Sequence, residues 1–272
     1  MNLSSTLAGA AGQPPTRSSS SAGSVFLPKE HGSWSLALEP VVLGLLIAPS
    51  MAGLALACAS VTVLFLRRPF KAALGSAGTD RRGPAGFAFV VLASFSLIGL
   101  GEAFLFASPQ MLWPLLVAVP FCVLYGYFDG QGDSRAAAAE LSGSAAFAVL
   151  PLAFATLAGW PASAALALAA LALIRSIPTV LTVRGYLRMS KSRPFTPAVP
   201  LSAAALGFSA GLLLAAHHLV PWLAAGVSGL LLARTAWLIS PWRPIWTARR
   251  IGMTEAALGA AYVIVVALAY RT

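Results

Sequence analysis

Charged residues and cysteines are scarce in this sequence. Of its 272 residues only 10% are charged, and the acidic residues number eight, whereas a soluble domain carries about a quarter charged residues. This scarcity excludes an ordinary soluble domain. The two cysteines, Cys58 and Cys122, lie inside apolar runs, so they do not indicate a disulfide framework. No Cys and His residues have zinc-site spacing, and the sequence contains neither a P-loop nor a G-x-S-x-G motif.

Apolar residues, in contrast, are abundant and gather into repeated runs. They make up 58% of the chain, and its mean hydropathy is +0.81. A helix needs about 20 such residues to cross the hydrocarbon core of a bilayer. The runs predict an all-α, polytopic transmembrane bundle of about nine helices at Ser33–Ala48, Met51–Leu66, Gly83–Phe106, Met111–Tyr127, Ala138–Leu157, Ala162–Val183, Pro197–Ala216, Val220–Ser240 and Gly252–Tyr270.

The first two runs are separated only by Pro49 and Ser50. A single helix from Trp34 to Leu66 would be about 50 Å long at a rise of about 1.5 Å per residue. The hydrocarbon core is only about 30 Å thick. We therefore expect a tight helical hairpin.

Basic residues lie almost entirely on one side of these predicted spans. With the amino terminus inside, the inside segments hold 15 of the 18 lysines and arginines, and only Arg271 lies at the outer end. The positive-inside rule then predicts a bacterial cytoplasmic-membrane protein with its amino terminus in the cytoplasm. The net charge of +10 is interpreted as topology and contact with lipid head groups rather than nucleic-acid binding.

The chain divides into a tail and a membrane domain. Residues 1–25 are rich in Ser, Ala, Gly and Pro, and we expect this tail to be disordered. It has no apolar segment of the kind found in signal peptides. Residues 26–272 form the predicted transmembrane domain, whose inside connections are the longer and more polar ones. Long loops more often carry function, so the working face is predicted to be the cytoplasmic one.

Three residues at or within the membrane are candidates for chemistry. His31 could act as an acid, a base or a phosphate ligand, or it could be an interfacial anchor beside Trp34. Glu39 lies about 12 Å deeper, where a carboxylate normally faces a cavity or a partner. Arg175 lies about 13 Å from the inner end of its span. We predict that Glu39 and Arg175 face one cavity and pair, either as a functional site or as a structural ion pair.

Clusters of cations at the inner ends are candidates for holding an anion. Arg67, Arg68 and Lys71 fall within five residues, and arginine can bind phosphate through two parallel hydrogen bonds. Arg184 and Arg188 recur at helical spacing on a continued helix. Tyr127 is a further candidate for substrate binding. The alternative is ordinary positive-inside charge.

Three acidic residues near the fourth-to-fifth connection are candidates for a metal site. Asp129, Asp133 and Glu140 could hold Mg²⁺ against a diphosphate, because carboxylate oxygens suit that ion. The glycines between the two aspartates indicate a loop. The alternative is therefore a solvated turn in which Asp side chains cap the backbone.

A short motif near the amino terminus resembles that of the YwiC-like family of bacterial membrane proteins. The family's P-K-x-H-G-x-W element is matched at the start of the first span, and R-R-P-F-K follows the predicted hairpin. The resemblance supplies a family without implying a reaction. The residues that carry it are Pro28, Lys29, His31, Gly32 and Trp34, with Arg67–Lys71.

The span layout also resembles, more distantly, that of UbiA-type intramembrane prenyltransferases. Those enzymes have nine helices and carry Asp-rich motifs in the second-to-third and sixth-to-seventh connections. This chain has Leu66–Lys71 at the first position, and Thr179–Arg184 followed by Arg188 at the second. The resemblance implies the bundle layout, whereas basic residues replace the acidic motifs and could hold a phosphate without metal.

Together these features predict a cytoplasm-facing basic cavity that binds an anionic, lipid-linked or isoprenoid molecule. If the protein is an enzyme, we expect group transfer or rearrangement on that lipid, with His31 and Glu39 as the acid and base. The alternatives are a small-molecule transporter or flippase, and a non-catalytic assembly factor for a membrane complex.

Overall fold

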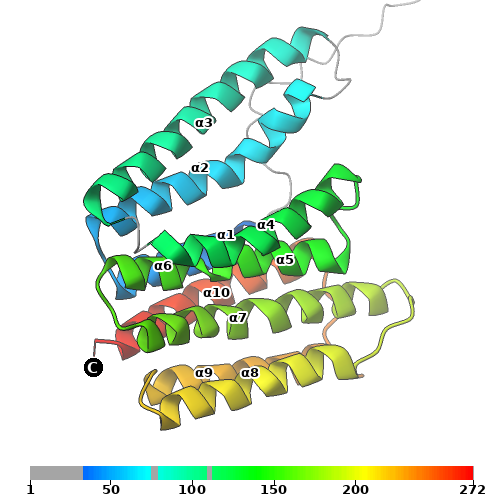
Figure 1. Ribbon diagram of the computed structural model, residues 1–272. Helices are drawn as coiled ribbons and strands as arrows, with labels where there is room; N and C mark the ends of the chain where they lie inside the picture. Colours follow the sequence, from blue (N-terminus) through cyan, green and yellow to red (C-terminus); the bar gives the residue numbers. More distant parts are fainter. Residues whose placement is uncertain (1–32, 75–78, 109–111, 272) are drawn as a thin grey trace, which may run out of the picture.

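The computed structural model describes residues 33–74, 79–108 and 112–271, and all the regular structure in these ranges is helical. Successive helices run in opposite directions, except that α5 and α6 follow one another in the same direction. The α4–α5 and α7–α8 connections therefore lie at one end of the bundle, and the α6–α7 and α8–α9 connections lie at the other (Figure 1). The helices in the described part are α1 (Ser33–Ile47), α2 (Met51–Leu74), α3 (Thr79–Phe106), α4 (Trp113–Gly130), α5 (Ala137–Ala148), α6 (Leu150–Leu157), α7 (Ala162–Met189), α8 (Ala198–Ala216), α9 (Trp222–Leu238) and α10 (Ala248–Ala269).

These helices correspond to the predicted spans once α5 and α6 are taken together. The two are consecutive halves of one apolar segment, Ala137–Leu157, interrupted at Val149. Pro151 lies in the first turn of α6, where its missing N–H is tolerated. Seven helical segments of the described chain are long and apolar enough to cross a membrane, while α1 and α9 are shorter apolar helices. The chain is thus a multi-pass membrane protein.

The hairpin predicted at Pro49 and Ser50 is confirmed. The side chain of Ser50 accepts a hydrogen bond from the backbone N–H of Gly53 at 3.0 Å, which caps the start of α2. However, α2 continues to Leu74, well past the expected end at Leu66. The basic segment Arg67–Lys71 is therefore helical, whereas we expected it to open the connection. Because the segment is helical, Arg67 and Lys71, which are four residues apart, project from the same face of α2.

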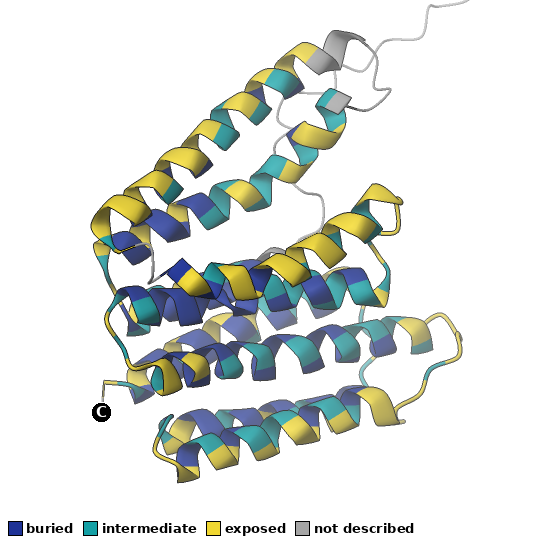
Figure 2. Cartoon of the chain, viewed as in Figure 1, coloured by how far each residue is buried: buried dark blue, intermediate teal, exposed yellow. Residues whose placement is uncertain are grey.

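The core lies around α7, in the middle of the bundle. This helix packs against α5, α6, α8 and α9, while α1 packs against α5, α6 and α10. The α2–α3 hairpin lies at one edge and the α8–α9 hairpin at the other (Figure 1). Buried residues concentrate in the central helices, and exposed residues dominate α3 and α4 (Figure 2). Since the exposed side chains of α3 and α4 are largely apolar, these helices present a surface suited to lipid.

Candidate functional site

The centre of the polar interior is Arg175, on α7. Its side chain is 3% exposed, and its Nε lies 3.1 Å from Oε2 of Glu39 on α1. Glu39 is itself buried. The pairing predicted from the depth of these two residues in their spans is therefore confirmed.

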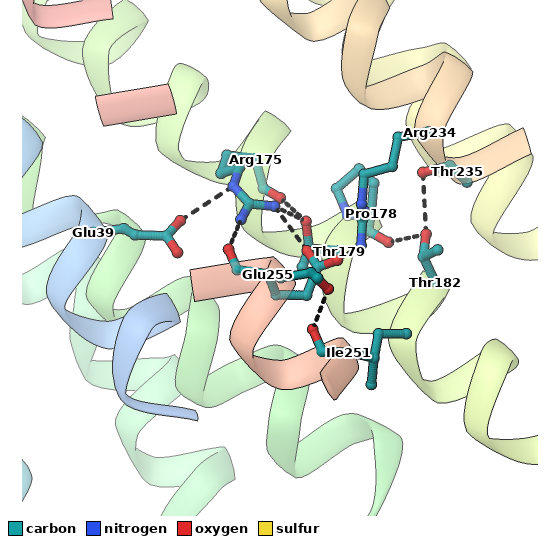
Figure 3. A network of polar contacts seen from close by, with 10 residues as sticks. Glu39, Arg175, Pro178, Thr179, Thr182, Arg234, Thr235, Ile251 and Glu255 are labelled. Carbon is teal, nitrogen blue, oxygen red and sulfur yellow. Dashed lines mark hydrogen bonds and ion pairs between the residues drawn. The ribbon is translucent and has the colours of Figure 1, made fainter. Parts of the chain in front are cut away.

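A second acidic residue, Glu255 of α10, lies on the other side of Arg175. Arg175 Nη1 lies 3.5 Å from Glu255 Oε2, and Nη2 donates to the Glu255 backbone carbonyl at 3.1 Å. Glu255 also forms an ion pair with Arg234 of α9. Glu39, Arg175, Glu255 and Arg234 are hereafter called the deep charge network (Figure 3). Its two acids and two arginines alternate, so it is formally neutral, which offsets part of the cost of burying four ions.

Threonine hydroxyls surround this network on α7 and α9. Arg175 donates to Thr179, whose hydroxyl in turn donates to the Arg175 carbonyl at 2.7 Å. Thr182 donates to the carbonyl of Pro178 at 2.6 Å and lies 3.2 Å from the Thr235 hydroxyl. The polar groups of α7 are thus largely satisfied within the protein, as groups inside a bilayer must be.

A glycine on α10 makes room for the carboxylate of Glu39. A Cβ atom at Gly259 would overlap the Glu39 side chain. Gly259 follows Glu255 by one helical turn, so both face the same neighbour. Close approach of α1 and α10 at this point is what brings Glu39 within reach of Arg175.

The hollow beside the deep charge network is small. It has a volume of about 10 Å³ and is lined by Glu39, Arg175, Ser176 and Tyr262, among others. That volume corresponds to about one water molecule. In this conformation the hollow is therefore too small for a lipid substrate.

A second polar cluster lies near the carboxyl-terminal ends of α2 and α4, the ends predicted to face inward. Arg67 Nη2 and Lys71 Nζ lie 2.5 and 2.7 Å from the same oxygen of Asp129, Oδ1. Lys71 also donates to the Asp129 backbone carbonyl at 3.2 Å. The guanidinium of Arg67 stacks over the ring of Tyr125, 5.4 Å from its centroid. We call Arg67, Lys71 and Asp129 the inner cation clamp. It combines two cations with one carboxylate.

Arg184, another of the predicted anion-binding residues, lies at a different contact. Arg184 pairs with Glu140 at 2.7 Å and donates to the Arg135 carbonyl at 2.8 Å. Arg188 and Tyr127 are exposed, and Arg68 is half-buried. The structure thus divides the predicted cations between the deep charge network, the clamp and the α5–α7 contact, whereas the sequence suggested one site.

The three predicted metal ligands are also placed apart. Asp129 belongs to the clamp, Glu140 pairs with Arg184, and Asp133 is exposed in a turn. Among the described residues, no group of three or more His, Cys, Asp or Glu side chains is arranged to hold a metal ion. A role for Mg²⁺ at these positions stays a prediction.

Some predicted features fall outside the described residues. His31 and the other motif residues before Ser33 are among them, as is the tail of residues 1–25. The acid–base role assigned to His31 therefore stays a prediction.

Glu255, the ion-pair partner of Arg234, was not among the site residues predicted from the sequence. Glu255 is the fourth residue of the predicted span Gly252–Tyr270, so it lies too near the start of that span for the depth argument that identified Glu39. Its partners could not be named from the sequence, because α7, α9 and α10 meet only in the folded bundle. Gly259 carries no signal of its own among the 24 glycines of the chain.

Part of the chain matches the model of a known protein family. Residues 27–155 match the model of the YwiC-like protein family, which confirms the resemblance seen in the sequence. No curated protein and no solved structure matches the chain. The matched segment contains Glu39 and the inner cation clamp, and it ends before Arg175, Arg234 and Glu255.

Proposed function

We propose that this YwiC-like membrane protein binds the phosphate group of an anionic lipid at the inner end of its bundle. The observation that supports this proposal is the inner cation clamp, in which Arg67 and Lys71 converge on a single oxygen of Asp129. A phosphate offers several acceptor oxygens in place of one, and arginine binds it in a bidentate manner. In this proposal the Asp129 carboxylate occupies, in the absence of lipid, the position between Arg67 and Lys71 that the lipid phosphate would take.

The surroundings of the clamp suit an amphipathic ligand. Phe70 lies between the two cations in the sequence, is 46% exposed and pairs with Phe89 of α3, with ring centroids 5.5 Å apart. The side chains of Arg67 and Lys71 are 42% and 45% exposed, so both are accessible to a head group. Apolar surface thus lies beside exposed positive charge, which is the combination that a lipid phosphate requires.

The ligand that fits this arrangement is a lipid-linked or isoprenoid phosphate in a bacterial cytoplasmic membrane. Arg68, Arg184 and Arg188 would add positive charge around the head group on the cytoplasmic side. If the protein is an enzyme, it transfers or rearranges a group on that lipid, with His31 and Glu39 as the acid and base. Because Glu39 is buried against Arg175, that chemistry would require the ion pair to separate.

The deep charge network supports a second candidate function, which is transport of a small molecule or ion. Ionisable residues within a membrane often mark the path of an ion or a proton. Solute uptake by proteoliposomes containing the purified protein would favour this function. The third candidate, a non-catalytic assembly factor, is favoured if the network only fixes helix packing.

The lipid proposal is tested by native mass spectrometry of the detergent-solubilised protein with phosphatidic acid, using phosphatidylcholine as the neutral comparison. Wild-type protein is expected to retain phosphatidic acid preferentially. The double variant R67Q/K71Q should bind it at least about tenfold more weakly, since a charge-assisted hydrogen bond contributes about 1.5–3 kcal/mol. Asp129→Asn should bind it more tightly, because the cations are released from their internal partner.

Arg249→Gln is the matched control, because Arg249 is an exposed cation at the start of α10 and lies outside the clamp. The control should bind as the wild type does. Equal binding by wild type, R67Q/K71Q and D129N would contradict the proposal. If R249Q and R67Q/K71Q lost affinity for phosphatidic acid to the same extent, binding would instead reflect a general attraction between basic residues and anionic lipid.

A further inference from the structure

The two ends of the α2–α3 hairpin are attached to the rest of the bundle in different ways. At its proximal end, where α2 begins and α3 ends, apolar side chains of both helices are buried in one cluster with side chains of α1 and α6. The buried members from the hairpin are Ala52, Ala55, Leu56, Ala57 and Ala103. The proximal end is thus packed firmly into the bundle.

The distal end of the hairpin, where α2 ends and α3 begins, is packed differently. In the described stretch from Ser60 to Ala73, Pro69 is the only buried residue of α2, and α4 has no buried residue after Ala118. The hairpin leans away from α4 toward this end (Figure 1). Here α2 is joined to α4 by the ion pairs of the inner cation clamp.

The hairpin itself is held together along its length. The hydroxyls of Thr62 and Ser96 lie 2.6 Å apart, and a Cβ atom at Gly99 would overlap the α2 backbone. Nearer the distal end, the rings of Phe70 and Phe89 pack with their centroids 5.5 Å apart. Because α2 and α3 adhere to each other at several levels, they can move as one body.

The ion pairs of the clamp are the contacts that a competing ion can replace. The side chains of Arg67 and Lys71 are 42% and 45% exposed. Ion pairs between exposed groups are individually weak, since water or another ion can take the place of either partner. The apolar cluster at the proximal end has no charged group for such an ion to bind. A change at the clamp therefore acts on the distal end alone.

We propose that the inner cation clamp is a conformational latch. While Asp129 pairs with Arg67 and Lys71, the distal end of the α2–α3 hairpin is held against α4. When these pairs separate, the hairpin pivots outward as one unit about its packed proximal end. The lipid phosphate of the proposed function is the ligand that separates them, and only this last step rests on that proposal.

Distances between nitroxide spin labels test the latch in the full chain, reconstituted in phosphatidylcholine nanodiscs after both native cysteines are replaced by serine. The distal pair of labels is placed at Phe87→Cys on α3 and Ser190→Cys after α7. The proximal pair is placed at Leu105→Cys on α3 and His217→Cys after α8. All four positions are exposed, so a label at each is tolerated.

The variant D129N should lengthen the distance across the distal pair by more than the width of the wild-type distribution. The variant R67Q/K71Q should do the same, because either change removes the ion pairs. The distance across the proximal pair should stay unchanged in both. An unchanged distal pair in D129N would overturn the latch, as would equal lengthening at the two ends, since the hairpin would then detach instead of pivoting.

Glu140→Gln is the matched control. It removes another ion pair at the same end of the bundle, between Glu140 and Arg184 at 2.7 Å, but α5 and α7 also pack directly against each other. Both label distances should therefore stay as in the wild type. Lengthening of the distal pair in this variant would show that loss of any ion pair at this end loosens the bundle, and would overturn the latch.

Phosphatidic acid in the nanodiscs separates this inference from the proposed function. With it, the wild-type protein should show the longer distal distance of D129N. If D129N lengthens the distance and phosphatidic acid does not, the latch stands and the lipid phosphate is not its ligand. If native mass spectrometry shows that the clamp retains phosphatidic acid while the distal distance stays short, the lipid site stands and the latch is wrong.

Discussion

At the scale of single residues, the deep charge network explains how four ionised side chains persist within a membrane bundle. Burying an isolated charge is costly, and a buried pair is sustained only when its geometry and hydrogen bonding are good. Arg175 meets this condition by contacting Glu39, Glu255 and Thr179 together. The consequence is that removing any one charge leaves an uncompensated partner.

Glu255→Gln tests this interdependence. We expect the variant to lose about 3–5 kcal/mol of stability, because Arg175 and Arg234 would share only one acid. Glu140→Gln, which removes a half-exposed partner of Arg184, should cost less than about 1 kcal/mol. Thermal or denaturant unfolding in detergent would measure both.

The double variant E255Q/R234Q restores formal neutrality to the network. It should therefore be more stable than E255Q alone. A double variant that is no more stable than the single one would show that the hydrogen bonds of Glu255, rather than charge balance, maintain this region.

At the scale of helices, the close contact between α1 and α10 depends on a glycine, Gly259, which has no side chain. Gly259 allows the Glu39 carboxylate to lie against the α10 backbone. The adjacent helices then come close enough for the ion pair to form. A larger residue there would force the helices apart or displace Glu39 from Arg175.

Gly259→Ala is accordingly expected to destabilise the protein by about 1–3 kcal/mol, as overpacking a buried contact does. Gly226→Ala is the control, since a Cβ there would meet no atom within 4 Å. That change lies on an exposed helical position and should be neutral or stabilising by up to about 1 kcal/mol. If Gly259→Ala matched the control, close contact between Gly259 and Glu39 would be ruled out.

At the scale of the whole molecule, the charged residues form two groups, one buried among the helices and one in the connections between them. The interior holds the deep charge network, which is formally neutral. The connections at one end of the bundle hold the excess of basic residues. At that end Arg67 and Lys71 both pair with Asp129. Alternating helices place the basic segments at a common end. The positive-inside rule predicts that this end faces the cytoplasm.

Cysteine labelling tests this orientation in intact cells. With Cys58 and Cys122 first replaced by serine, Ser190→Cys lies after α7 and His217→Cys lies after α8. A membrane-impermeant maleimide should label His217→Cys and leave Ser190→Cys unlabelled until the cells are broken. The reverse pattern would place the inner cation clamp on the outside and remove the basis for the cytoplasmic proposal.

The amino-acid sequence by itself determined the membrane class, the helical hairpin at Pro49 and Ser50, and the span layout. It did so because apolar runs must match the thickness of a bilayer and basic residues resist crossing it. Depth within a span also sufficed to select Glu39 and Arg175 as partners, since a buried charge needs one.

Only the tertiary structure decided which charges meet. Glu255 and Arg234 lie far from Arg175 in the sequence, and Asp129 lies 62 residues from Arg67. Helical periodicity gives the face on which a residue lies within one helix, but not which helix packs against that face. For that reason the sequence suggested one anion site and a trio of metal ligands, whereas the folded chain separates a neutral, closed network from an exposed cation clamp.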